Sequence, residues 1–221
     1  VEPVEPAAFA RFLVEWQSVS APRPGMEALL GVVEQLQGAP IPASVLETEV
    51  LPARVERYKS SDLDALCAAG EVVWRGLEPL GPSDGRIALY LPDRLPLLAR
   101  AGTPVEGELA AKIRRLLSSR GALFFPDLLA ELGGFPGDLL TALWDLVWSG
   151  EVANDTLTPL RSLLRGSPGS SSRRGRRAAG SGYRSRRRWA FWPRHRQWGT
   201  AAAIFLATFV GHGLFGLLIA W

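Results

Sequence analysis

The chain of 221 residues is 47% hydrophobic and 21% charged, which is enough apolar sequence for one or two small units with real cores. A single cysteine excludes a disulfide-stabilised fold, and that cysteine with two histidines cannot form a closed zinc site. The net charge of +3 is unevenly distributed: residues 1–155 hold 13 basic and 22 acidic side chains, whereas residues 156–221 hold 12 arginines and no acid. We therefore expect an acidic folded body and a basic extension able to meet phosphates or anionic lipid.

Three helices are predicted in the first 51 residues. The helix at residues 7–19 carries an apolar stripe that we expect to pack on the segment after it, formed by Phe9, Phe12, Leu13 and Trp16. A second helix covers residues 26–37 and stops at Gly38. A third covers residues 43–51, and Pro52 ends it because proline cannot continue the helical hydrogen bonds.

A helix followed by a hairpin is predicted next. Residues 61–69 form an amphipathic helix that ends at Gly70, because glycine adopts the left-handed conformation that closes a helix. Cys67 lies in this helix, where we expect a buried structural thiol. Extended segments at 72–75 and 85–91 follow, separated by a turn. A helix that leads into a two-stranded wing is typical of a winged helix-turn-helix.

The same order recurs after a linker at residues 92–102. Thr103-Pro104-Val105-Glu106 has the pattern of a capping box and predicts the start of a helix. Residues 138–149 form an amphipathic helix that Gly150 ends, with an inner face of Leu139, Leu140, Leu143, Leu146 and Val147. A short helix at 158–164 follows. We therefore predict a mainly α fold with small β wings, in which residues 1–91 and 103–164 are tandem winged-helix units, the second with a shortened wing.

Two further segments complete the chain. Residues 165–199 are rich in Arg, Ser and Gly, so we expect them to be disordered. Residues 200–221 are almost wholly apolar, and two explanations stay open. Either 201–221 is a transmembrane helix flanked by arginines and tryptophans, or the segment is the product of a shifted reading frame.

Basic side chains are the candidate nucleic-acid contacts. The predicted recognition helices expose the carboxylates of Asp62 and Asp64, and of Asp138 and Asp145, which would repel a DNA backbone. We therefore expect these helices to pack rather than to read sequence. The candidate phosphate contacts are Arg54, Arg57, Lys59, Lys112, Arg115, Arg173, Arg174, Arg176, Arg177, Arg184, Arg186, Arg187 and Arg188. Most of the affinity is expected in the segment 173–188.

No catalytic, cofactor-binding or metal-binding residue is predicted. The sequence contains no G-x-x-x-x-G-K-[ST] phosphate loop. The G-x-G-x-x-G match at 211–216 lies inside an apolar run and lacks the strand–turn–helix context that a dinucleotide site needs. Asp127 and Glu131 are spaced i, i+4, which is typical of a solvated helix face.

Several short motifs, taken in order, resemble the carboxyl-terminal region of the large helicase-related (Lhr) proteins. They are LPARV at 51–55, GEVVWRG at 70–76, ALWDLVWSG at 142–150, NDTL at 154–157 and PLR at 159–161. Lhr proteins are bacterial superfamily 2 ATP-dependent DNA helicases. The resemblance implies a DEAD/H-associated winged-helix region beside a motor that translocates on single-stranded DNA and unwinds duplexes in repair. ATP and Mg are implied for the full-length family and for no residue of this chain.

Two functions from different classes follow. The first is an accessory nucleic-acid-handling region of a cytoplasmic helicase, with DNA, in particular single-stranded DNA, and the upstream motor domains as partners. Because the chain does not begin with methionine, it is expected to be a piece of a longer protein, here without its motor. The alternative is a helical adaptor that binds a protein and is anchored to a membrane through 201–221. The DNA on either side of the reading frame separates the two.

Overall fold

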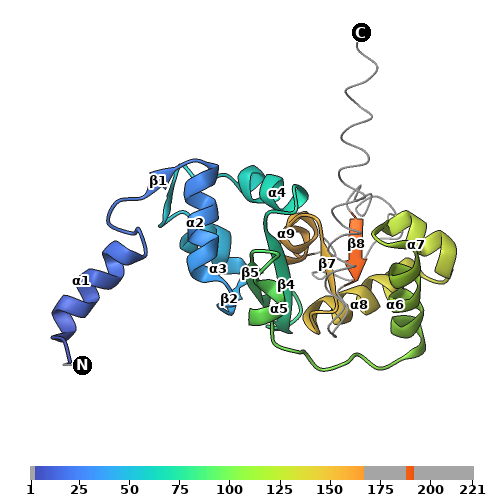
Figure 1. Cartoon of the computed structure of the whole chain (residues 1–221). Helices are drawn as coiled ribbons and strands as arrows, with labels where there is room; N and C mark the ends of the chain where they lie inside the picture. The colour runs from blue at the N-terminus through green and yellow to red at the C-terminus, as the bar shows by residue number, and fades with distance from the viewer. Residues whose placement is uncertain (1–2, 167–187, 192–221) are drawn as a thin grey trace, which may run out of the picture.

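The computed structural model describes residues 3–166 and 188–191, and the expectations for 200–221 lie outside them. Figure 1 shows two groups of helices and short strands side by side, with the first helix projecting from one end. Among the described residues, no helix is long and apolar enough to span a bilayer.

The first unit follows the winged-helix order. Its helices are α2 (Met26–Leu36), α3 (Ala43–Val45) continued by a π-helical turn η1 (Leu46–Val50), and α4 (Ser60–Ala68). Its antiparallel sheet has the order β2-β5-β4, from β2 (Ile41–Pro42), β5 (Gly85–Tyr90) and β4 (Val73–Pro79). A parallel pair, β1 (Arg23–Pro24) and β3 (Val55–Glu56), lies beside the helices. The predicted helices and hairpin of this unit are confirmed.

The end of α4 shows why the sequence pattern predicted it correctly. Gly70 has a φ of 77°, and the amides of Glu71 and Val72 donate to the carbonyl of Leu66, which closes the helix and starts the extended segment. Leu63, Leu66 and Cys67 face the core. The Cys67 thiol is buried as expected, and burial raises its pKa above the ordinary value of 9.0.

The second group has the same order of elements. Its helices are α6 (Glu108–Arg120), α7 (Phe125–Leu132), α8 (Pro136–Trp148) and α9 (Thr158–Leu164). Its sheet has the order β6-β8-β7, from β6 (Leu123–Phe124), β8 (Arg188–Phe191) and β7 (Val152–Asn154). Gly150 has a φ of 70° and ends α8 as predicted, with Leu139, Leu143, Leu146 and Val147 buried.

The central strand of this second sheet corrects the prediction of disorder at residues 188–191; residues 167–187 and 192–199 of the predicted segment lie outside the described residues. Residues 188–191 pair antiparallel with both β6 and β7, and Trp189 is 0% exposed. Its indole meets that of Trp144 edge to face, with the ring centroids 6.0 Å apart. The wing of the second unit is therefore completed by a distant segment rather than by a shortened local hairpin. The arginine-rich composition around it concealed a strand that carries the buried Trp189.

One hydrophobic cluster runs through both groups. It extends from Leu29 and Val33 of α2, through Trp74 of β4, to Leu143 of α8 and Trp189 of β8. The segment 92–102, predicted to be a linker, contains the short helix α5 (Leu95–Leu98), which buries Leu95 against Ala88 and Tyr90.

Glycines allow the close approach of the first wing to α8. A Cβ on Gly76 of β4 would lie 2.3 Å from the carbonyl oxygen of Val147, and one on Gly85 of β5 would lie 2.4 Å from the Trp148 ring. Trp74 donates its indole N–H to the carbonyl oxygens of Asn154 and Thr156, at 2.9 and 3.1 Å. The wing is therefore packed against the second unit rather than presented to solvent.

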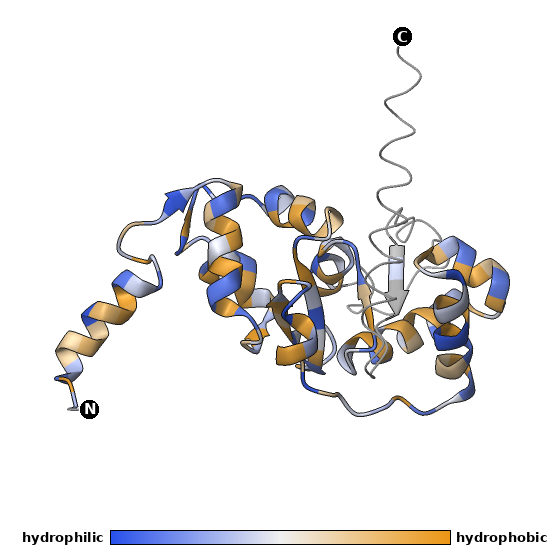
Figure 2. Cartoon of the chain, in the orientation of Figure 1, coloured by the Kyte–Doolittle hydropathy of each residue, from blue (hydrophilic) through white to orange (hydrophobic). Residues whose placement is uncertain are grey.

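The first helix corrects a second expectation. In α1 (Pro6–Trp16) no residue is buried, and the predicted apolar stripe is exposed: Phe9 is 50%, Phe12 52%, Leu13 39% and Trp16 56% accessible. Figure 2 shows apolar residues along α1 where it projects from the body. The stripe was predicted correctly as a helix face, but the expectation that it packs on the following segment was wrong.

Candidate nucleic-acid interface

The helices in the recognition position, α4 and α8, both make packing or ion-pair contacts within the protein. Helix α8 buries Leu143 and Trp144 and lies against β4, although Asp138 and Asp145 remain exposed as expected. In the first unit, Asp64 of α4 is only 18% exposed, which corrects its assignment to a solvent-facing surface. The packing of α8 on β4 and the burial of Asp64 in α4 both agree with the expectation that these helices pack rather than read sequence.

Asp64 is held by an ion-pair cluster centred on Arg161 of α9. The guanidinium donates to Glu47 at 2.6 and 2.9 Å and to Asp64 at 2.7 Å, while Asp64 also accepts from the Leu157 amide at 2.9 Å. Burial disfavours the charge of Arg161, but the two carboxylates raise its pKa above the ordinary value. Burial, and then a hydrogen bond donated to Glu47, raise the pKa of Tyr58. This cluster joins α9 to η1 and α4.

A second buried ion pair corrects the predicted capping box. Glu151 has a side chain 4% exposed, and the Arg114 guanidinium donates to both of its carboxylate oxygens. The Val105 amide donates to the same carboxylate at 3.3 Å, and the Val105 carbonyl accepts from Arg114. Residues 103–106 are therefore held outside the helix, and α6 starts later, after Gly107. The interaction with Glu151 outweighs the local capping preference.

Glu151 gives a pH-dependent prediction. Burial alone would raise the pKa of its carboxyl, but the hydrogen bonds from Arg114 and Val105 outweigh burial and hold that pKa below the ordinary 4.5. Because the pKa of Glu151 is lower in the folded state than in the unfolded state, its carboxylate stabilises the fold fully at pH values above the ordinary pKa. This contribution is lost as the pH falls below about 4.5. We expect Glu151→Gln to be less stable at neutral pH and to have a flatter stability curve below pH 4.5, measured by urea unfolding across pH.

The control for this prediction is the exposed Glu71, which follows Gly70 as Glu151 follows Gly150. Glu71→Gln should keep the acid dependence of the unchanged protein, because its carboxylate is not held in a buried pair. If Glu151→Gln showed the same loss of stability in acid as the unchanged protein, another group would be responsible.

The predicted basic residues fall into separate places. Arg54, Arg57 and Lys59 lie together on the segment between η1 and α4. Arg57 has a side chain 86% exposed and lies 3.6 Å from Glu56. Lys112 and Arg115 lie on α6 in the other unit, and Lys112 is paired with Glu108 at 2.7 Å. The first three residues thus share one segment of the first unit, and the other two lie on a helix of the second unit.

Arg173, Arg174, Arg176, Arg177, Arg184, Arg186 and Arg187 lie outside the described residues, and Arg188 is described by its backbone in β8.

Arg23 is a basic residue that sequence reasoning missed. Its strand β1 pairs parallel with β3, in a register that places Arg23 opposite Val55. It therefore joins the segment that carries Arg54 and Arg57. We call these four residues, Arg23, Arg54, Arg57 and Lys59, the basic corner. A strand of two residues that begins next to prolines gives no periodic signal from which this pairing could have been found.

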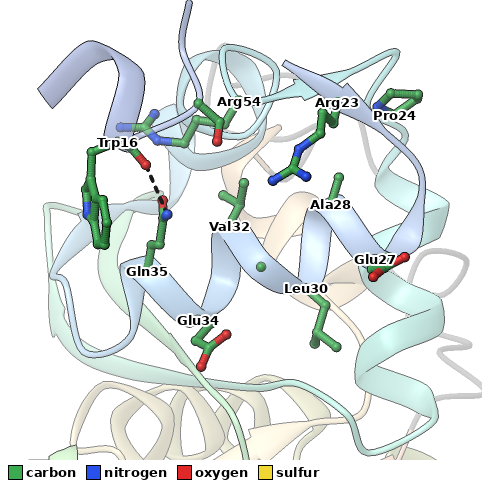
Figure 3. A pocket seen from close by; sticks show the side chains of 12 residues that line it. Trp16, Arg23, Pro24, Glu27, Ala28, Leu30, Val32, Glu34, Gln35 and Arg54 are labelled. Atoms are coloured by element: carbon green, nitrogen blue, oxygen red, sulfur yellow. Dashed lines mark hydrogen bonds between the residues drawn. The ribbon is translucent and has the colours of Figure 1, made fainter. Parts of the chain in front are cut away.

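A cavity of about 810 Å³ lies between the end of α1, β1 and α2. Figure 3 shows Trp16 at one end of it, with Arg54 and Arg23 above the helix α2 and the carboxylates of Glu27 and Glu34 at its margin. Arg54 is fixed there: its Nε donates to Gln17 at 3.3 Å and its Nη1 to the Val50 carbonyl at 2.9 Å. The cavity adjoins the basic corner and shares Arg23 and Arg54 with it.

Comparisons with known proteins relate the chain to the helicase-related proteins. Residues 4–92 match the model of the winged-helix domain of the large helicase-related protein. The chain is 43% identical over 170 residues to "Lhr helicase/ probable uracil glycosylase" of Mycolicibacterium smegmatis, covering 75% of this chain and 11% of that relative. The chain corresponds to a winged-helix region of the large helicase-related (Lhr) proteins. It is also 36% identical over 205 residues to "Lhr helicase/uracil glycosylase" of Escherichia coli, covering 80% of this chain and 13% of the relative.

The Lhr resemblance drawn from short motifs is thereby confirmed, as is the winged-helix assignment of the first unit. The chain spans about a tenth of the length of these Lhr relatives. The helicase and uracil glycosylase activities are named for those whole proteins. Within residues 3–166 and 188–191, no cluster of three His, Cys, Asp or Glu side chains is placed to hold a metal ion.

Proposed function

We propose that this chain is an accessory nucleic-acid-handling region of an ATP-dependent superfamily 2 DNA helicase active in repair, and that it guides single-stranded DNA beside the motor. The supporting observation is the basic corner, where two-residue strands gather arginines from segments far apart in sequence. The correspondence of the chain to a region of the Lhr proteins supports the helicase context. Phosphate contacts of this kind position a strand without reading its bases.

The second unit serves in this proposal as a second winged helix that braces the first. Its order α6, β6, α7, α8, β7, β8 parallels the order α2, β2, α3, α4, β4, β5. The helix α8, which in a DNA-reading unit would enter the major groove, is instead packed against β4. We therefore assign DNA binding to the basic corner of the first unit and to the arginines of the extension. The latter, Arg173–Arg187, are proposed on charge alone.

The test must keep β8 intact. Truncation after Leu164 would remove the central strand of the second sheet along with the arginines, so its effect on DNA binding could not be attributed to charge. We therefore propose replacing the extension arginines by glutamine in the whole chain while leaving β8 unchanged: Arg173, Arg174, Arg176, Arg177, Arg184, Arg186 and Arg187. A second variant combines Arg57→Gln with Lys59→Gln, and a third combines Lys112→Gln with Arg115→Gln.

Affinity for a fluorescent single strand is measured by anisotropy over a range of salt concentrations. We expect the extension variant to lose most of the affinity and the corner variant to lose a smaller part. Each lost phosphate contact should lower the slope of log affinity against log salt by about 0.7. The α6 variant should have a smaller effect than the corner variant, because Lys112 lies 2.7 Å from Glu108, closer than the 3.6 Å between Arg57 and Glu56. Arg94→Gln with Arg100→Gln, two exposed positions in 92–102, controls for net charge.

The results separate the possibilities. Affinity retained in both the extension and the corner variants would overturn the proposal. An equal loss in the Arg94 and Arg100 control would show that net charge alone is responsible, and would also contradict a localised contact surface.

A further inference from the structure

We propose that the cavity between α1 and α2 binds one nucleotide of a single DNA strand, with its base stacked on Trp16 and its phosphate beside Arg23 and Arg54. This inference rests on the proposed function and names a site within it. The cavity volume of about 810 Å³ lies in the range of small-molecule sites. It combines an accessible aromatic ring with guanidinium groups, the two elements of sequence-independent single-strand binding.

Trp16 is held in place while its ring remains accessible. Its carbonyl oxygen accepts a hydrogen bond from Gln35 Nε2 at 3.0 Å, which ties the end of α1 to α2. Its indole stacks on Phe12 with the ring centroids 5.7 Å apart and the planes 23° from parallel. The residue is nevertheless 56% exposed. A supported but half-exposed indole offers a flat platform for a base, because every base has a face that stacks.

The two arginines are placed for a phosphate by different means. Arg54 uses Nε and Nη1 for Gln17 and Val50, so its guanidinium is oriented before any ligand arrives. Arg23 is exposed, and among the described residues it forms no ion pair. Figure 3 shows its side chain directed toward α2 over the cavity. The free guanidinium of Arg23 can move to meet the phosphate of a flexible strand, and the fixed guanidinium of Arg54 can then bind it.

The floor and the margin of the cavity define what fits. A Cβ on Gly31 would meet nothing within 4 Å, so the surface of α2 is open there, beside Ala28. Glu27 and Glu34 at the margin balance the charges of Arg23 and Arg54. Binding at this site must therefore depend on stacking more than on net charge. A single nucleotide with its phosphate on the arginine side suits the site better than a run of closely spaced phosphates.

The test uses the whole chain with Trp16→Ala and Trp16→Phe. The probes are a short oligothymidylate and an abasic strand of equal length, which has phosphates but no bases. We expect Trp16→Ala to weaken oligothymidylate binding by about fivefold to a hundredfold, as for other stacking residues, with an unchanged salt slope. Binding of the abasic strand should not change, and Trp16→Phe should recover most of the loss.

Arg23→Gln gives the complementary result. It should lower the salt slope by about 0.7 for both strands, because it removes one phosphate contact. Phe135→Ala is the matched aromatic control, since Phe135 is 78% exposed in the other unit. Far-UV circular dichroism should show that each variant retains the fold.

Two outcomes would overturn the site. One is an unchanged oligothymidylate affinity in Trp16→Ala, which would show that no base stacks on this ring. The other is an equal loss for the abasic strand, which would exclude stacking. In either case a loss of affinity in the corner or extension variants would leave the proposed function standing. No loss in any variant would remove both.

Discussion

Trp189→Ala should destabilise the protein by about 3 to 5 kcal/mol, the range for truncating a large aromatic side chain in a core. Trp189 is 0% exposed in the central strand β8 and meets Trp144 edge to face, so alanine would leave a cavity between the second sheet and α8. Urea unfolding followed by far-UV circular dichroism measures the effect.

A milder substitution makes the same experiment more specific. The Trp189 Nε1 is buried and makes no hydrogen bond among the described residues. Trp189→Phe gives up no such bond and should cost much less than alanine, because it keeps most of the buried ring. Phe135→Ala, at a residue 78% exposed, should leave the midpoint nearly unchanged. A Trp189→Ala midpoint equal to that of the unchanged protein would show that β8 is not part of the stable fold.

Arg161→Leu should be the second most damaging single change, at about 3 kcal/mol, near the lower end for breaking a buried ion pair. Arg161, Glu47 and Asp64 have side chains only 15 to 18% exposed, so leucine would leave two poorly solvated carboxylates without their partner. The helix α9 would also lose its bonds to η1 and α4. The free energy of unfolding from urea titration measures the loss.

Arg165, which directly follows α9, provides the control. Arg165→Leu, at an exposed position, should change stability by no more than about 0.5 kcal/mol. Replacing Glu47 and Asp64 by leucine together with Arg161 should restore much of the loss, because an apolar cluster needs no charge partner. If the triple variant were as unstable as Arg161→Leu alone, unpaired charge would not explain the damage; shape, or the hydrogen bonds that Glu47 and Asp64 accept from Tyr58 and Leu157, would explain it instead.

The local structure was largely predictable because it depends on nearby residues. The helices that end at Gly70 and Gly150 combine an apolar stripe with a glycine that adopts the positive φ needed to close them. The hairpin of β4 and β5 follows from two extended runs and the turn between them. Each of these signals is complete within a few residues of sequence.

The features that were missed depend on partners distant in the sequence. Asp64 looked exposed because Arg161, which neutralises it, comes 97 residues later. The start of α6 was placed too early because Glu151 holds Val105 outside the helix. Arg23 joined the candidate site only through a strand pairing of two residues. No periodicity or local preference encodes these contacts, so they needed the folded arrangement.

The position of β8 also sets an order of events during synthesis. The sheet of the first unit is complete once Tyr90 has left the ribosome, whereas β6 and β7 must wait for Phe191. Until then their strand edges are unpaired and are the part of the nascent chain most exposed to wrong pairing. The sheet of the first unit can therefore be complete, and can contact α8, before the second sheet closes.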